Sequence, residues 1–228
     1  MTTAPKAGFS VEVTEGGPYV IDGTAVVRSA TPVVSERGEP MTWRYGAPEV
    51  VEGAALCRCG ASDDKPFCDG SHAEVDWDAA CTPPEGSSAE RARTKTGTGL
   101  TLVDDDVLCM HAGFCGTERT SVWRMMGDTA DTEVRATVIR MVEKCPSGRL
   151  ANRIDDTIVE PSLPAEIGVV PDGPLWLTGG IDVDGVETRN RMTLCRCGAS
   201  STKPLCDGSH VDIDFSAPAP TDETEDSP

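Results

Sequence analysis

Cysteine and histidine side chains are concentrated in two segments of nearly identical sequence. Each segment is sixteen residues long, which is too short to bury an apolar core of its own. Three thiols and one imidazole in so short a segment are typical of a metal centre, so the sequence predicts two metal sites. The predicted ligands are Cys57, Cys59, Cys68 and His72 in the first segment and Cys195, Cys197, Cys206 and His210 in the second.

The spacing divides each set of four ligands into two pairs. Cys57 and Cys59 are one residue apart, so both side chains can project to the same side of an extended backbone. Cys68 and His72 are four residues apart, across an Asp-Gly turn. Glycine in that turn allows a positive φ and leaves amide groups free to donate to sulfur. Two pairs of ligands suit two iron atoms.

The complete pattern resembles the CDGSH iron-sulfur domain family, the mitoNEET-like proteins, whose signature is C-x-C-x2-[S/T]-x3-P-x-C-D-G-[S/T/A]-H. Both segments meet this signature in full, including Ser62 with Pro66 and Ser200 with Pro204. The resemblance implies that each set of three cysteines and one histidine ligates one [2Fe-2S] cluster. A neutral imidazole in place of a thiolate makes such a cluster easier to reduce, and protonation of that imidazole would make it sensitive to acid.

A structural zinc site is the alternative, because three cysteines and one histidine also suit tetrahedral Zn(II). Zinc sites usually pair their cysteines as C-x2-4-C, whereas both segments open with C-x-C. The spacing therefore favours iron.

A third group of ligands lies between the two segments. Cys109, His111 and Cys115 are followed at a distance by Cys145, which precedes a proline. The segment resembles single-cluster ferredoxin domains, in which C-x2-C-x2-C is completed by a distant C-P, but Ala112 stands where the second cysteine would be. The resemblance implies a third cluster on the three cysteines, either [3Fe-4S] or a [4Fe-4S] centre with His111 as a possible fourth ligand. Buried cysteines without a cluster are the alternative.

An internal duplication organises the chain, because residues 56–77 and 194–215 are identical at 15 of 22 positions. The glycine-bounded apolar stretch 17–23 resembles 173–179, so the duplication extends upstream, with a longer connection in the first copy, at 24–55. We expect a first CDGSH module at 15–80, a ferredoxin-like single-cluster domain at 100–160, a second CDGSH module at 170–216 and a disordered acidic tail at 217–228. We expect residues 82–99 to form a polar linker.

The expected fold class is α+β, mainly short strands and loops, with two small β-rich modules that could form an internal pseudo-twofold pair and a small ferredoxin-like α/β insertion. A helix is expected at 132–144, capped by Asp131, because apolar residues recur there on one face. Strands are expected at 26–27, 41–44, 54–56, 175–177, 181–183 and 191–194.

Composition restricts the partners. The net charge of −18 disfavours nucleic acid and anionic membranes and favours a basic protein partner. Neither a cationic leader nor a long apolar run is visible, so we expect a cytoplasmic protein whose ten cysteines are reduced, with Cys81 a spare thiol. The four tryptophans are expected in module cores.

These observations predict a protein that transfers electrons, and possibly clusters, between partners such as a flavin reductase or a ferredoxin. No enzymatic site is expected, because all three histidines lie in the metal-binding patterns. A monomer with an internal pseudo-dimer is plausible. The alternatives are a redox, pH or iron sensor or a cluster-storage module, and, less favoured, a structural zinc protein.

Overall fold

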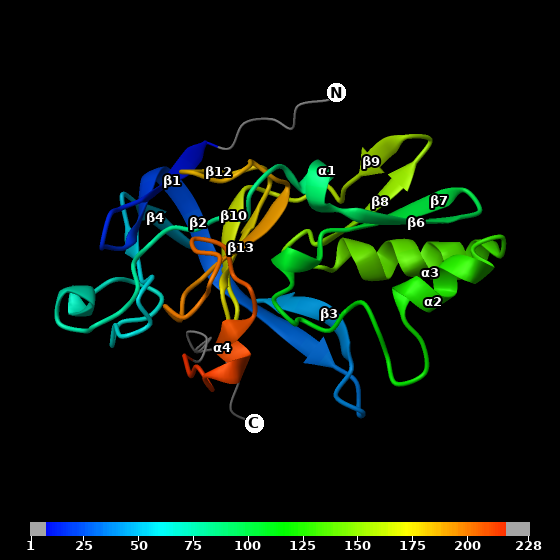
Figure 1. The fold of residues 1–228 in the computed structure, drawn as a ribbon. Coiled ribbons are helices and arrows are strands. Elements are labelled where there is room, and N and C mark those ends of the chain that lie inside the picture. The colour runs from blue at the N-terminus through cyan, green and yellow to red at the C-terminus, as the bar shows by residue number, and fades with distance from the viewer. Residues whose placement is uncertain (1–7, 218–228) are drawn as a thin grey trace.

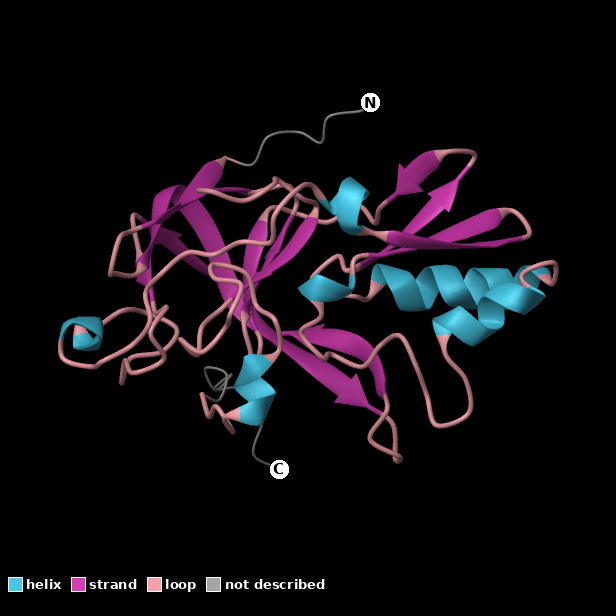
Figure 2. Ribbon diagram, in the orientation of Figure 1, coloured by secondary structure: helices cyan, strands magenta, loops and turns pink. Residues whose placement is uncertain are grey.

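The computed structural model describes residues 8–217 and has an α+β fold of strands and loops with few helices (Figure 2). Its two parts are a large strand-rich region and a smaller region, coloured green in Figure 1, that carries the longest helix. Within the described residues no helix is both long enough and apolar enough to cross a bilayer.

The large sheet has nine strands, ordered β12-β1-β2-β10-β11-β13, with β3, β4 and β5 also paired to β2. Buried side chains alternate with more exposed ones along the first part of β2, which buries Tyr19, Ile21, Ala25 and Val27 on one face of the sheet. The strands are β1 (Phe9–Val13), β2 (Tyr19–Val34), β3 (Pro40–Tyr45), β4 (Glu49–Glu52), β5 (Ala55–Leu56), β10 (Glu166–Val169), β11 (Leu175–Thr178), β12 (Asp182–Val183) and β13 (Arg191–Leu194).

The smaller region is an antiparallel sheet ordered β6-β7-β8-β9, against which α2 and α3 pack. Asp131 caps α3 by accepting hydrogen bonds from the Glu133 and Val134 amides, as expected. The elements are β6 (Arg93–Gly97), β7 (Leu100–Asp104), α2 (Val122–Met125), α3 (Thr132–Glu143), β8 (Leu150–Ile154) and β9 (Thr157–Val159). The remaining helices are α1 (Ser88–Arg91), α4 (Ser209–Asp212) and the 3-10 turns η1 (Ser71–Ala73), η2 (Asp106–Leu108) and η3 (Met126–Asp128).

The two duplicated copies exchange strands in equivalent registers. Val11 of β1 pairs in parallel with Val183 of β12. Ile167 of β10 pairs in parallel with Val27 of β2. Val11 and Ile167 each lie eight residues before the first residue of β2 or β11, and Val27 and Val183 each lie eight residues after it. Each copy therefore supplies a strand to the other, and the two share one apolar core.

The longer connection of the first copy forms an arm, the β2–β3 hairpin, that reaches the smaller region (Figure 1). The ring of Trp43 in β3 lies tilted against the Phe114 ring, with 4.8 Å between their centroids, and its indole N–H donates to the Lys144 carbonyl at 3.1 Å. The Lys144 ammonium in turn donates to the Met41 carbonyl. The arm thus fixes the smaller region to the strand-rich one.

Two sequence expectations need correction. The predicted linker at 82–99 contains α1 and strand β6, which pairs with β7 along its whole length. β6 is an edge strand of mostly exposed polar residues, so it carries no apolar alternation to reveal it. The predicted tail begins with Ala217, which is buried and whose carbonyl accepts from Arg196; the rest of the predicted tail lies outside the described residues.

The other expected elements are present, although β2 is sixteen residues long and is not a short strand. Strands at 41–44, 175–177 and 191–194 lie within β3, β11 and β13. β5 and β12 are each two residues long, within the expected 54–56 and 181–183. Of the four tryptophans, Trp176 is fully packed, whereas Trp43, Trp77 and Trp123 are half-buried.

Candidate metal centres

The first set of predicted ligands lies in the loop that follows β5. Cys57 Sγ and Cys59 Sγ are 3.9 Å apart, and Cys68 Sγ lies 3.3 Å from His72 Nδ1. Two thiolates bound to one tetrahedral metal through bonds of about 2.3 Å lie about 3.8 Å apart. Each pair is therefore spaced to hold one metal atom.

The second set repeats this arrangement in the loop that follows β13. Cys195 Sγ and Cys197 Sγ are 3.7 Å apart, and Cys206 Sγ lies 3.4 Å from His210 Nδ1. Both duplicated segments thus present one sulfur–sulfur pair and one sulfur–nitrogen pair. Among the described residues, no group of three or more His, Cys, Asp or Glu side chains is arranged to hold a single metal ion.

Glycine turns shape both loops as expected. Gly70 and Gly208 each have φ of +95°, and each follows an aspartate whose carboxylate accepts hydrogen bonds from a serine. The Ser71 hydroxyl lowers the pKa of Asp69. In the second copy burial opposes the shift, but the hydrogen bonds from Ser209 still lower the pKa of Asp207. These carboxylates therefore stay ionised and hold the turns closed.

Burial makes several of the thiols difficult to ionise without a cation. It raises the pKa of Cys57 and of Cys206. A hydrogen bond from Cys197 instead lowers the pKa of Cys195 to about 6, so the pair shares one proton. A bound metal displaces such protons, because the thiolate is the form that ligates.

An arginine between the paired cysteines anchors each loop. Arg58 and Arg196 are both 1% exposed. Arg58 Nε donates to the Gly17 carbonyl at 2.8 Å, and Arg196 Nε donates to the Gly173 carbonyl at 2.9 Å. Each guanidinium also lies over the aromatic ring that ends its duplicated segment. The equivalent contacts support the upstream extension of the duplication that the sequence indicated.

The two C-x-C loops pack directly against each other. A Cβ on Gly60 would lie 2.6 Å from the Cys197 carbonyl oxygen, and a Cβ on Gly198 would lie 2.4 Å from the Cys59 carbonyl oxygen. No larger residue fits at either position without moving backbone. This close contact is reciprocal, as are the exchanged strands.

The two sets differ in exposure. Cys195, Cys206 and His210 are all buried, at 0%, 3% and 8% exposed. Cys57, the counterpart of Cys195, is also buried, but Cys68 and His72, the counterparts of Cys206 and His210, are only half-buried. The first set is thus the more accessible to solvent, although the two sequences are nearly the same.

The third predicted group comes together around one pocket, lined by Cys109, His111, Ala112, Cys115 and Cys145. Burial raises the pKa of Cys115, and Cys145 and Cys109 add to the shift, as expected for three neighbouring thiols. Ala112, where the second cysteine of the ferredoxin pattern would be, lies in the same wall. The residues present therefore fit a cluster with three thiolate ligands.

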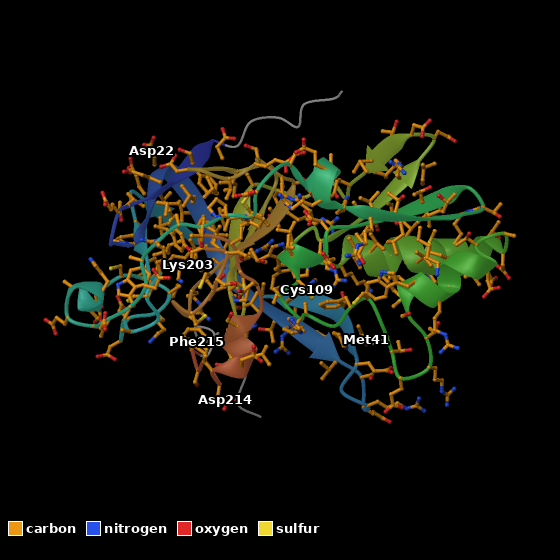
Figure 3. The ribbon with its side chains drawn as sticks, viewed as in Figure 1. Asp22, Met41, Cys109, Lys203, Asp214 and Phe215 are labelled. Atoms are coloured by element: carbon orange, nitrogen blue, oxygen red, sulfur yellow. The ribbon has the colours of Figure 1, made fainter. Side chains whose placement is uncertain are left out.

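The third group lies against the second set. A Cβ on Gly208 would come within 2.3 Å of His111 Cδ2, 2.9 Å of His111 Nε2 and 3.3 Å of the Cys109 carbonyl oxygen. Gly70, the equivalent residue of the first set, has nothing within 4 Å of the same position. Figure 3 accordingly places Cys109 where the strand-rich region meets the helix-bearing one.

Arg191 of β13 joins the same two regions and is 1% exposed. Its NH1 donates to the carbonyl of Cys145 at 2.8 Å and to those of the last residues of α3. Its Nε and NH2 bind both carboxylate oxygens of Glu160 at 2.7 and 2.8 Å. At the corresponding position the first copy has Gly53, which is exposed.

The sequence identified all of the clustered cysteines and histidines but overlooked Arg58, Arg196 and Arg191. The first two could have been noticed, because arginine recurs within both C-x-C pairs. Arg191 gave no signal, since its partners are distant in sequence. Cys81 is exposed and outside the three groups, and its sulfur accepts from Arg58 NH1 at 3.3 Å.

Comparison with protein-family models found two families. The family described as iron-binding zinc finger, CDGSH type, matches residues 16–73 and 172–211. The family described as divergent 4Fe-4S mono-cluster matches residues 95–154. No curated protein and no solved structure matched the chain. The matched segments contain all three groups of predicted ligands.

Proposed function

The chain contains two CDGSH-type iron-binding segments on either side of a divergent 4Fe-4S mono-cluster segment, and from this premise we propose that it is an electron-transfer protein with three iron–sulfur clusters. The observation that carries the proposal is the division of both CDGSH sets into two ligand pairs. One pair for each iron suits a [2Fe-2S] cluster, whereas a single zinc ion would need all four ligands around one point.

The proposed ligands follow from these pairs. In each CDGSH set, the two cysteines of C-x-C hold one iron, and the remaining cysteine and the histidine Nδ1 hold the other. The clusters supply one-electron chemistry when bound. The chain's own residues keep the sulfurs apart, exclude water from the second set and direct backbone amides at sulfur, as the Ala61 N–H does at Cys59 Sγ.

In the middle group, we propose three thiolate ligands, Cys109, Cys115 and Cys145. A [3Fe-4S] cluster fits this number of ligands, because Ala112 provides no thiolate for a fourth iron. A [4Fe-4S] cluster would require another ligand, the role for which the sequence suggested His111; the centre proposed here has the three thiolates as its only protein ligands.

We also propose that the two CDGSH copies form a pseudo-twofold pair inside one chain. The equivalent registers of the exchanged strands and the reciprocal packing of Gly60 and Gly198 support this arrangement. A monomer would then contain what two single-motif chains would otherwise assemble.

The proposed partners are redox proteins, such as a flavin reductase or a ferredoxin. The net charge of −18 favours a cationic partner and opposes nucleic acid. We propose no substrate chemistry, because all three histidines belong to the ligand groups.

Iron and acid-labile sulfide analysis of the purified chain tests the proposal. We expect about seven or eight iron atoms per chain, two from each CDGSH set and three or four from the middle group. Cys68→Ser and Cys206→Ser should each remove two iron atoms, whereas Cys81→Ser, at a cysteine outside the groups, should remove none. Zinc without sulfide would refute the proposal.

A cluster-storage or sensor function is the second candidate, and the half-buried ligands of the first set favour it. Transfer of a cluster to an apo-ferredoxin distinguishes it from electron transfer. A storage protein should donate the cluster faster than a flavin reductase reduces it, and an electron carrier should show the opposite order.

A further inference from the structure

Among the described residues, the middle ligand group packs against the second CDGSH set at a position where the first set has no neighbour. The Cδ2–Nε2 edge of His111 fills the space beside Gly208, and nothing fills the equivalent space beside Gly70. Gly208 lies midway between the predicted ligands Cys206 and His210, and His111 lies between Cys109 and Cys115. One side chain therefore separates the two ligand sets.

Other contacts place the same two sets together. Leu108 and Ser147 of the middle segment line a small pocket with Cys206 and Met192 of the second copy. Arg191 of the second copy holds the carbonyl of Cys145.

We propose that His111 is a positioning residue, which seats the middle ligand group against the second CDGSH set, so that the middle group interacts with the second set and not with the first. This inference rests on the proposed function, since it requires clusters at these ligands. It removes His111 from the iron ligands and gives two nearly identical motifs different surroundings. The second set is the more buried and lies beside the middle group, whereas Cys68 and His72 of the first set are half-buried.

Electron paramagnetic resonance measures this pairing directly, since a nearby paramagnetic centre speeds the relaxation of a reduced [2Fe-2S] cluster. Cys57→Ser/Cys59→Ser leaves only the second set, and Cys195→Ser/Cys197→Ser leaves only the first. Each variant is compared with and without the further change Cys115→Ser. We expect loss of the middle centre to lower the half-saturation power several-fold when the second set remains, and to leave it unchanged when the first remains.

A matched pair of substitutions keeps the proposal falsifiable if one of these variants does not fold. Gly208→Ala and Gly70→Ala impose the same strain, because both glycines have φ of +95°, but only the first collides with His111. Gly208→Ala should change the resonance of the middle centre, although residue 208 lies outside the middle segment. Gly70→Ala should leave it unchanged.

Iron content separates failure of this inference from failure of the proposed function. A chain with too little iron and sulfide refutes the function itself. With full iron content, equal relaxation effects on both CDGSH sets, or equal effects of the two glycine substitutions, would overturn the pairing. His111→Ala should keep the iron content of the wild type, and loss of middle-centre iron in that variant alone, with the fold intact by circular dichroism, would identify His111 as a ligand.

Discussion

The buried side chain of Arg196 shows how a single residue stabilises a ligand loop. Arg196 is 1% exposed, and burial lowers its pKa to about 10 while the nearby Cys57 opposes the shift. Its NH2 and Nε donate to three backbone carbonyls, including that of Ala217. The guanidinium is thus both a cross-link for the loop and a positive charge beside thiolates.

Replacement of this arginine should destabilise the protein. Arg196→Met leaves buried carbonyls without donors, so we expect a loss of about 3 kcal/mol in the free energy of unfolding. Urea unfolding of the iron-loaded protein measures it. Arg37→Met, at an exposed arginine, is the control and should change the value little. An equal loss in both variants would show that the Arg196 contacts contribute nothing specific.

The two CDGSH sets should also lose iron at different rates. Because Cys68 and His72 are half-buried and Cys206 and His210 are buried, an iron chelator should reach the first set sooner. We expect the visible absorbance of the two clusters to fall in two phases. In Cys57→Ser/Cys59→Ser the fast phase should be missing; if the slow phase is missing instead, the order of accessibility is wrong.

For single residues, the sequence was most informative where the predicted ligands are close together in the chain. The CDGSH ligands lie within sixteen residues, so their grouping could be predicted without a fold. The difference between half-buried His72 and buried His210 could not, because burial depends on packing between distant segments, such as that of His111 beside Gly208, which has no equivalent beside Gly70.

Among the elements, β13 is joined to the end of α3 by the side chain of Arg191. Arg191 satisfies the final carbonyls of α3 and holds Cys145 in place, which is what a helix C-terminus requires. Arg191→Ala should therefore release the end of α3 and remove the three or four iron atoms of the middle group, at a cost of about 3 kcal/mol.

Iron analysis and circular dichroism of the Arg191 variant check this expectation. Arg191→Lys keeps the charge but cannot make all of the contacts, so it should retain an intermediate amount of iron. Arg153→Ala, at a half-buried arginine of β8, should retain the full amount. Normal iron content in Arg191→Ala would show that the middle group forms without this support.

Element prediction succeeded where local signals are strong. The bounds of α3 follow from its apolar face and its Asp131 cap, both of which are local. The arm formed by β2 and β3 appeared in the sequence only as a longer connection, because its role depends on Trp43 meeting Phe114 about seventy positions later. The sequence did not predict β6, because this strand is defined by its pairing with β7 and has mostly exposed residues.

At the scale of the whole molecule, the exchanged strands make the two copies interdependent. β1 pairs with β2 of its own copy along one edge and with β12 of the other copy along the other edge. In the same way, β10 pairs with β11 of its own copy and with β2 of the other. We therefore expect a fragment of residues 1–90 to lack cooperative unfolding when expressed alone. Adding residues 91–228 should restore the far-ultraviolet circular dichroism of the intact chain. Cooperative unfolding of 1–90 by itself would contradict this interdependence.

The duplication was visible in the sequence, but its interlocked form was not. Identity between residues 56–77 and 194–215 indicates two equivalent units without saying which strands they share. Strand exchange depends on parallel pairs such as Val11 with Val183, more than 170 residues apart. Such pairs have no local sequence signal.

The same exchange sets an order for biosynthesis. The ribosome releases the first copy well before it has made β12, so β1 remains an open edge until residue 183 emerges. An open edge is a place where chains aggregate, and a nascent chain would need protection there until the second copy arrives. The first copy would therefore complete its part of the sheet only when the second copy has been made.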